Sequence, residues 1–404
     1  MFFGWYIVVG TLVAQLLLIG FFTYAVSLLI GPVQAEFGVS LEDVMYSLTM
    51  GTLVGMVAMP VGGILIDRFS ARWVMTAGAI FYAVGLYAIS QAETIGAYVV
   101  WFGVTMAVGN ALVGAQSSTT TISRWFTSSR GRALGISALG TSIGGVLIPW
   151  LMTRWIEVDG WRVAVENLAW IVAVVLVPLM ILSIRGTPEE AGMHPEGGEQ
   201  PASVQPMGAL TIGEVLKNPG YWYIGLCLGL LFCAYSAVLS NITPYATGLG
   251  VDTAAAAQLI MVVAIAGFIG KLIFGFVADK VNLKFGLWAA LALVFTGFVI
   301  LSFQPSYSLM VLATVCLGLA AGGQLPVWGA MMAKVFGLVS YGKAMGLMGP
   351  LITLMVMPGF VVVGYMVDST GSYEAVLQLF SGMIVLSAIL LVPLRFPEES
   401  QAAG

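Results

Sequence analysis

Long apolar runs recur from one end of this sequence to the other, and they constrain its fold more than any other feature. A run of about 18 residues or more is long enough to cross a hydrocarbon layer of about 30 Å as a helix. Only 8% of the 404 residues are charged, whereas an ordinary soluble domain carries about 25%. The period-two alternation that a membrane β-barrel requires is missing. The sequence therefore predicts an all-α membrane protein.

We predict twelve transmembrane helices from these runs. Their approximate boundaries are 5–30, 44–66, 73–91, 98–121, 134–153, 163–184, 221–247, 254–277, 285–303, 307–333, 344–366 and 373–394.

The distribution of lysine and arginine predicts how these helices are oriented. With both termini in the cytoplasm, only Arg154 and Arg162 lie outside and twelve of the fifteen basic residues lie inside, as the positive-inside rule requires. The twelve are Arg68, Arg72, Arg124, Arg130, Arg132, Arg185, Lys217, Lys280, Lys284, Lys334, Lys343 and Arg395. The N-terminus has no basic region or cleavage site of a signal peptide. We expect an integral plasma membrane protein, specifically of a prokaryotic inner membrane.

Residue types that carry catalysis are scarce. Cys227 and Cys233 fall in one predicted helix and Cys316 in another, which is typical of apolar packing rather than of a disulfide or metal site. The single histidine, His194, falls in a polar loop. No set of nucleophile, base and orienting residue and no phosphate-binding loop is visible. We therefore predict no enzyme activity, no metal, no cofactor and no nucleic-acid partner.

The sequence is duplicated. The polar segment 185–220, rich in Pro, Gly and Glu, separates six predicted helices from six. GGILIDR at 62–68 then matches FGFVADK at 274–280, and GRALGI at 131–136 matches GKAMGL at 342–347, at nearly the same offset. Two six-helix halves that bind substrate between them near the bilayer midplane are a transporter architecture.

We accordingly predict two pseudo-symmetric six-helix bundles. Residues 1–184 form the N-terminal bundle, residues 185–220 a cytoplasmic linker and residues 221–404 the C-terminal bundle.

The G-x-x-x-D-R/K turn of each half resembles the signature of the major facilitator superfamily, and this resemblance covers essentially the whole chain. The residues that match are Gly63, Asp67, Arg68 and Arg72 in the first half and Gly275, Asp279, Lys280 and Lys284 in the second. A glycine usually follows the acid-base pair, and Ser70 and Asn282 stand there instead. The resemblance implies a major facilitator fold whose repeated motif stabilises the outward-facing state at the cytoplasmic side.

The motif also has a physical interpretation that does not need the resemblance. Gly63 and Gly275 would let a neighbouring helix approach closely. A carboxylate beside basic residues at a helix junction can pair with them and with a helix end. We therefore predict a gate that breaks and re-forms. The alternative is that these residues are ordinary loop charges that set the topology.

Lys271 is the charged residue that falls well inside a predicted helix. A lysine there costs about 2.5 to 3.5 kcal/mol on insertion scales. It could snorkel to the cytoplasmic end, about 9 Å away. However, side chains lean toward the N-terminus of their helix, and in this orientation that is toward the membrane middle. The counterpart of Lys271 in the repeat is Met59, which favours a substrate contact over a role in folding.

A buried ammonium with no embedded acid beside it favours an anionic substrate. A basic residue in the eighth helix followed by a glycine resembles the monocarboxylate transporters and the oxalate:formate exchangers of the superfamily, with Lys271 and Gly275 as the matching residues. Two features depart from that pattern: Gly267 stands where animal members place an acid, and Ser27 or Leu28 stands where they place a lysine. The resemblance implies carboxylate binding more firmly than it implies proton coupling.

Other candidates for the substrate path are polar or aromatic residues at mid-depth, which can donate hydrogen bonds or enclose an apolar tail. They are Tyr24, Asn110, Tyr235, Ser236, Asn241, Tyr245, Gln324 and Trp328. For each of them the alternative is an interhelical hydrogen bond or an interfacial anchor.

These observations predict a secondary active transporter of small monocarboxylates such as lactate, pyruvate or formate, which works by alternating access as a proton symporter or an anion exchanger. Its expected partners are the carboxylate, protons in the symport case, and the lipid bilayer, with a monomer as the transport unit. A proton-coupled exporter of drugs or other metabolites on the same fold is the alternative. A membrane receptor or enzyme that transports nothing is a more distant one.

Overall fold

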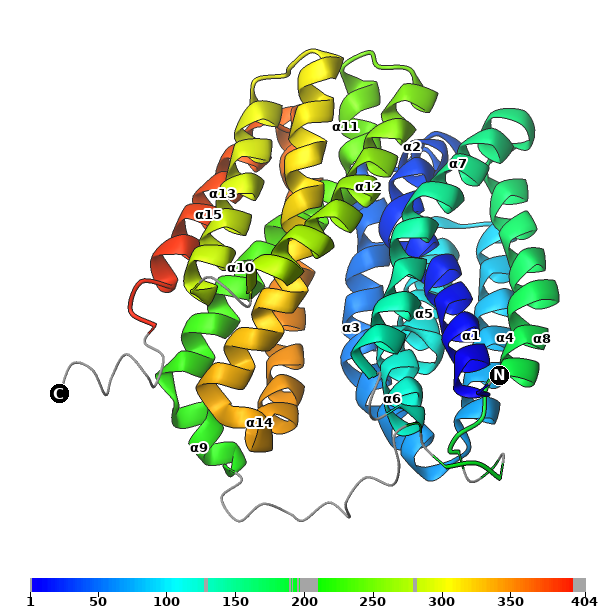
Figure 1. Cartoon of the computed structure of the whole chain (residues 1–404). Helices are drawn as coiled ribbons and strands as arrows, with labels where there is room; N and C mark the ends of the chain where they lie inside the picture. Colours follow the sequence, from blue (N-terminus) through cyan, green and yellow to red (C-terminus); the bar gives the residue numbers. More distant parts are fainter. Residues whose placement is uncertain are drawn as a thin grey trace. The chain divides into compact units, whose positions relative to one another are not determined.

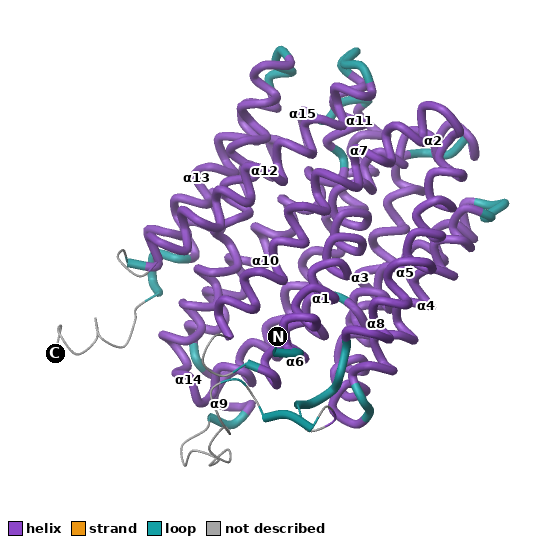
Figure 2. Tube along the Cα trace, turned by 45° about the vertical axis from the view of Figure 1, so that its right-hand side comes forward, coloured by secondary structure: helices purple, strands orange, loops and turns teal. Residues whose placement is uncertain are grey.

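The computed structural model describes residues 2–126, 130–188, 190, 192–194, 196, 210–278 and 282–394. Within these residues the chain is almost wholly helical, as Figure 2 shows, and it forms no strand. The chain divides into two compact units. Unit 1 is Met1–Ser203 with Ser240–Met261, and unit 2 is Val204–Leu239 with Val262–Gly404. The boundary that the repeat predicts, at residues 185–220, stays a prediction.

Unit 1 contains the helices of the first half of the sequence and a short piece of the second. The helices are α1 (Gly4–Ile19), the π-helical turn η1 (Gly20–Ala25), α2 (Val26–Phe37), α3 (Leu41–Arg68), α4 (Ala71–Ser90), α5 (Ile95–Val113), α6 (Ala115–Trp125), α7 (Arg130–Ile171), the π-helical turn η2 (Val172–Leu176), α8 (Val177–Ser183) and α11 (Ile242–Gly248). Within this unit α3 packs on α5, α4 on α5, and α1 on α7 (Figure 1).

Unit 2 contains most of the second half. The helices are α9 (Ile212–Lys217), α10 (Pro219–Ser240), α12 (Thr253–Ala278), α13 (Leu283–Ser302), α14 (Tyr307–Thr370) and α15 (Glu374–Leu390), of which the first residues of α12 belong to unit 1. Helix α13 packs against both α14 and α15.

The predicted spans agree with the helices of the described residues. Ten helical stretches there are long and apolar enough to cross a membrane. One of them, Arg132–Ser183, holds two predicted spans that meet at Gly160, where the left-handed φ of 84° breaks the helix. The twelfth predicted span corresponds to the shorter apolar helix α15. Each of the twelve spans that the sequence predicts therefore has a helical counterpart in the described part of the chain.

Glycines bring helices of unit 1 together. A Cβ at Gly103 on α5 would lie 2.8 Å from the backbone nitrogen of Gly51 on α3. Helix α7 meets α1 in the same way, because Gly144 would collide with the backbone of Leu16. Small residues at a crossing allow the backbones to approach, and such packing is the main attraction between helices in lipid. The fifth predicted span therefore packs on the first through a glycine.

In unit 2 the eighth and tenth predicted spans cross in the same way as the second and fourth predicted spans do in unit 1. The backbone of α14 at Gly318 lies directly against that of α12 at Val263, which is the residue 212 positions after Gly51. The first-half crossing uses Gly51 and Gly103, so equivalent pairs of helices meet at equivalent places. This agreement is the structural form of the duplication seen in the sequence.

Polar side chains fix several helix ends. Ser40 caps α3 by accepting a hydrogen bond from the backbone N–H of Asp43 at 3.1 Å, while the Asp43 carboxylate accepts from the N–H of Ser40. A capping box of this kind contributes about 1 kcal/mol. Ser70 and Asn282 are the N-cap residues of α4 and α13, with φ of −60° and −56°. Neither needs a left-handed backbone, so the turns form without the glycine of the family pattern.

A charged network ties together the ends of helices α2 and α4 and the middle of α7 in unit 1. Arg162 donates from Nε to Glu36 at 2.7 Å, and its other nitrogens donate to the carbonyl oxygens of Ser90 and Ala92, each at 2.6 Å. The indole of Trp161 also donates to Glu36. These residues follow the first, third and fifth predicted spans. The network therefore joins segments at one end of the unit that are distant in the sequence.

Candidate functional site

Lys271 lies in unit 2, at the place where α12 and α14 cross most closely. Its side chain is half-buried. Gly322 of α14 lies directly against its backbone nitrogen, and a Cβ at Gly322 would also come within 2.5 Å of the carbonyl oxygen of Gly267. Gly270, the residue before the lysine, packs equally closely on the backbone of Leu319. The embedded lysine therefore sits on a backbone that two helices hold rigidly.

Gln324 and Trp328 on α14 were both predicted to donate hydrogen bonds to a substrate. They are one helical turn apart, so they share a face of α14. Gln324 is 2% exposed. Its Nε2 and the Nε1 of Trp328 are buried, and among the described residues they have no hydrogen-bond partner. The Trp328 ring packs edge-on against Phe232 of α10 at 6.2 Å between centroids.

These donors are unusual in a packed interior. The great majority of buried polar groups in proteins are paired, and one left unpaired costs about 1 to 3 kcal/mol. A ligand that brings an acceptor would recover that cost. Gln324 and Trp328 were predicted as site residues from their residue type and depth, and the structure adds that their donors have no partner among the described residues.

Tyr235 and Ser236 are the other candidates in unit 2, and both belong to α10. Tyr235 is buried and Ser236 is half-buried. Phe232, one turn before Ser236, was not predicted as a site residue, although its ring contacts the ring of Trp328. An apolar aromatic among many others gives no sequence signal of such a role.

Four candidates belong to unit 1, and the side-chain amides of two of them contact neighbouring residues there. The Asn110 amide donates to the carbonyl oxygen of Met106 on its own helix at 3.0 Å, and that of Asn241 contacts the sulfur of Met45 at 3.5 Å. Tyr24 is half-buried in the π-helical turn η1, and Tyr245 is buried in α11. Their assignment to the substrate path stays a prediction.

A polar pair that the sequence did not indicate lies close to these residues. Ser27 of α2 and Thr243 of α11 are both buried, and their hydroxyl oxygens are 3.0 Å apart. This hydrogen bond and the contact between Asn241 and Met45 attach the outer part of the seventh predicted span to unit 1. Single hydroxyl residues in apolar runs are too common to predict such a pair.

The predicted gate motif is described only in part. The side chain of Asp67, the surroundings of Gly275 and the whole of Asp279 and Lys280 lie outside the described residues. Arg68 is exposed at the end of α3. The Arg72 guanidinium lies 5.1 Å from the ring of Trp73, and its buried Nε has no partner among the described residues. The backbone N–H of Lys284 donates to the Asn282 side chain. The role of the motif as a gate stays a prediction.

Among the described residues, the tight helix contact in this part of α3 lies beside Gly63, at Gly62. A Cβ at Gly63 would lie 3.7 Å from the nearest atom of another residue, an ordinary contact. At Gly62 it would lie 2.6 Å from the carbonyl oxygen of Ala111. The close approach of helix α5 therefore depends on Gly62, because successive residues of a helix point about 100° apart and only one of the pair can face α5.

Comparison with known proteins decides the family. Residues 12–304 and 268–404 match the Major Facilitator Superfamily. The chain belongs to this superfamily. It is 16% identical to the D-xylose-proton symporter, whose solved structure superposes with a TM-score of 0.73 over 96% of this chain and 97% of that one. The fold of this superfamily member is therefore the major facilitator fold.

Two curated relatives point to different kinds of cargo. Monocarboxylate transporter 12 of Mus musculus is 23% identical over 96% of this chain and 84% of its own length. The agnestins efflux protein AgnL12 of Paecilomyces divaricatus is 26% identical over 81% of this chain and 71% of its own length. The superfamily member is thus an integral membrane protein that resembles monocarboxylate transporters. Its murine and fungal relatives lend no support to the predicted prokaryotic inner membrane.

Proposed function

We propose that this protein is a secondary active transporter of small monocarboxylates, of the size of lactate, pyruvate or formate, which works by alternating access. The observation that carries the proposal is the embedded Lys271, held where α12 and α14 cross and within the same unit as two buried donors that have no partner among the described residues. A single cation in an apolar span favours a single anionic group on the substrate. The similarity to a monocarboxylate transporter supports the same substrate class.

In this proposal Lys271 binds the carboxylate as a point charge. Lysine lacks the planar fork of arginine, which grips a carboxylate with two parallel hydrogen bonds. Selectivity must therefore come from neutral donors and from shape. Gln324 and Trp328 supply two N–H groups on one face of α14, and Phe232 supplies an apolar wall against a short carbon chain.

The charge of Lys271 also suggests how transport is coupled. A bound carboxylate adds a negative charge beside the Lys271 ammonium, so a loaded carrier encloses less net charge during reorientation than an empty one. Burial of net charge is costly, so the substrate lowers the barrier and one anion exchanges for another. Proton symport is the second arrangement, in which Lys271 itself binds and releases the proton. Uptake driven by an inward proton gradient, with no anion inside the vesicle, would establish symport.

Uptake of radiolabelled lactate and pyruvate into liposomes tests the proposal. Wild type should accumulate label above protein-free vesicles, Lys271→Arg should retain part of this uptake, and Lys271→Met should retain none. Lys217→Met, which removes an exposed lysine of the same unit, is the matched control and should transport normally. If Lys271→Met transports as fast as wild type, the anion site lies elsewhere.

Export of drugs or other metabolites is the second candidate, and the efflux relative favours it. Inside-out vesicles separate the two functions. A monocarboxylate transporter should exchange labelled lactate for unlabelled lactate in either membrane orientation. An exporter should use a proton gradient to transport larger organic compounds and should not transport lactate. We further propose that the protein acts as a monomer in the plasma membrane, with both termini in the cytoplasm.

A further inference from the structure

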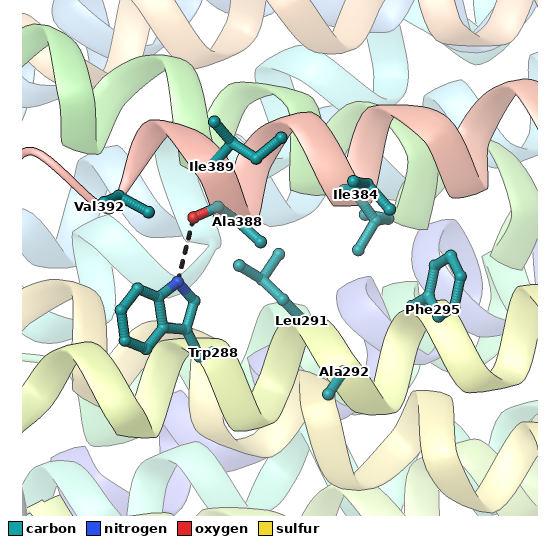
Figure 3. A pocket seen from close by; sticks show the side chains of 9 residues that line it. Trp288, Leu291, Ala292, Phe295, Ile384, Ala388, Ile389 and Val392 are labelled. Carbon is teal, nitrogen blue, oxygen red and sulfur yellow. Dashed lines mark hydrogen bonds between the residues drawn. The ribbon is translucent and has the colours of Figure 1, made fainter.

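An apolar groove runs between α13 and α15 on the surface of unit 2. Its volume is about 410 Å³. Figure 3 shows the side chains along it, which come from both helices and include Leu291, Phe295 and Ile389. The Trp288 indole closes one end by donating to the carbonyl oxygen of Ala388 at 3.1 Å. The groove is therefore a formed feature of two packed helices, with one hydrogen bond fixing its tryptophan wall.

Several side chains along the groove remain open to the surroundings of the protein. Ile389 is 57% exposed and Val392 62% exposed. In water such a surface would be a liability, but these helices are membrane spans, so the medium around them is lipid. An acyl chain is the ligand with matching shape and polarity.

The depth of the groove corresponds to one leaflet. From Trp288 to Phe295 the rise along α13 is about 10 Å at 1.5 Å per residue, against about 15 Å for half of the hydrocarbon layer. Trp288 lies near the first residue of α13, which the distribution of lysine and arginine predicts to be the cytoplasmic end. The groove would accept a chain from the cytoplasmic leaflet.

A lysine precedes the groove on α13. Lys284 is one helical turn before Trp288 on α13, so the two share a face of the helix. Side chains lean toward the helix N-terminus, so we expect the Lys284 side chain to extend away from the groove and toward the headgroup layer. Basic pockets at the cytoplasmic ends of membrane helices bind anionic headgroups, and each lysine near an anionic surface contributes about 1 kcal/mol.

We propose that this groove is a binding site for an anionic phospholipid of the cytoplasmic leaflet, with one acyl chain between α13 and α15 and its phosphate at Lys284. Tryptophan is the residue that prefers the boundary between acyl chains and headgroups, and Trp288 occupies that level. The site is separate from the proposed carboxylate site at Lys271, and Lys284 also belongs to the predicted gate motif.

Unit 1 contains a second groove that serves as a built-in control. It lies between α3 and α5, has a volume of about 400 Å³ and includes Thr49, Leu53 and Gly96. Its rim is acidic, because Asp43 lines it and the Tyr46 hydroxyl there donates to Glu42 at 2.6 Å. A carboxylate repels a lipid phosphate. Grooves of equal size thus differ in the charge at the mouth.

Native mass spectrometry of the purified full-length protein tests the site, with phosphatidylglycerol and phosphatidylcholine of identical acyl chains as probes. Wild type should retain one phosphatidylglycerol at least fivefold more than phosphatidylcholine. Ala292→Trp should reduce that retention about tenfold, because Ala292 is an exposed residue of the groove that a large ring would fill. Gly96→Trp in the acidic groove should leave it unchanged.

The charge at the mouth is tested separately. Lys284→Gln should abolish the preference for phosphatidylglycerol while leaving phosphatidylcholine retention as it is, and Lys284→Arg should restore the preference. Lys217→Gln is the control for net charge. Circular dichroism melting checks that every variant is folded.

Three results would overturn the proposal. Retention by Ala292→Trp equal to that of wild type would show that lipid binds elsewhere. Equal binding of the two lipids by wild type would remove the anionic preference. A lipid-free wild-type dimer that Ala292→Trp converts to a monomer would show that a second copy of this chain covers the groove.

Discussion

Gly322 of α14 lies against the backbone nitrogen of Lys271 on α12, and the space between the two helices there has no room for a side chain. Lys271, whose charge is proposed to bind the substrate, is thus positioned by a glycine. Position 322 fixes the distance between the helices, and through it the place of the lysine.

We predict that Gly322→Ala weakens carboxylate binding and lowers stability by about 1 to 3 kcal/mol, because an added methyl group forces packed backbones apart. Gly349→Ala is the control, since a Cβ at Gly349 on the same helix meets nothing within 4 Å. Thermal unfolding in detergent and isothermal titration with lactate measure the two effects. Equal melting temperatures of the two variants would contradict the prediction.

Gln324→Leu should separate binding from folding. Removing the buried unpaired amide leaves stability unchanged or raises it by about 1 kcal/mol, whereas carboxylate affinity should fall about tenfold. Thr105→Val, which removes a buried hydroxyl of unit 1 that has no hydrogen-bond partner among the described residues, should stabilise without changing affinity. A destabilised Gln324→Leu with normal affinity would instead indicate a structural partner for Gln324.

Trp328→Phe is expected to reduce affinity by a smaller factor, about three- to fivefold. It deletes the Nε1 donor and keeps an aromatic ring to pack on Phe232. Lactate and formate competition assays compare the loss for substrates of different length. If the apolar wall matters, Trp328→Ala should lose more affinity for lactate than for formate.

The lysine itself should be a cost to the folded protein. Lys271→Met removes a charge that insertion scales penalise by about 2.5 to 3.5 kcal/mol, so its melting temperature should equal or exceed that of wild type. The rise in melting temperature that saturating lactate gives wild type should disappear in the variant. A variant that melts lower and still responds to lactate would mean that Lys271 has a structural role.

Arg162→Met should destabilise unit 1 by about 2 kcal/mol, since Glu36 and the carbonyl oxygens of Ser90 and Ala92 all lose their donor. The control is Arg154→Met, whose guanidinium lies 5.3 Å from the Trp150 ring. Because the Glu36 pair is partly exposed, high salt should reduce the difference between the two variants. Melting curves at low and high ionic strength provide the measurement.

The sequence by itself determined where the spans lie, that the chain is duplicated, and that Lys271 is an unusual charge. These properties follow from the free energy of moving each segment from water into lipid, which is a sum over neighbouring residues. The helix caps at Ser40 and Asn282 are local for the same reason, because a cap satisfies backbone groups within a few residues.

Tertiary structure alone decided which small and polar residues matter. Gly62 meets another helix more tightly than Gly63 does, Gly318 and Gly322 are tightly packed while Gly349 is open, and Gln324 keeps a buried donor without a partner among the described residues. Each outcome depends on how one helix is rotated and shifted against another that is distant in the sequence. Packing of this kind is set by both surfaces at once, so no single stretch of sequence contains it.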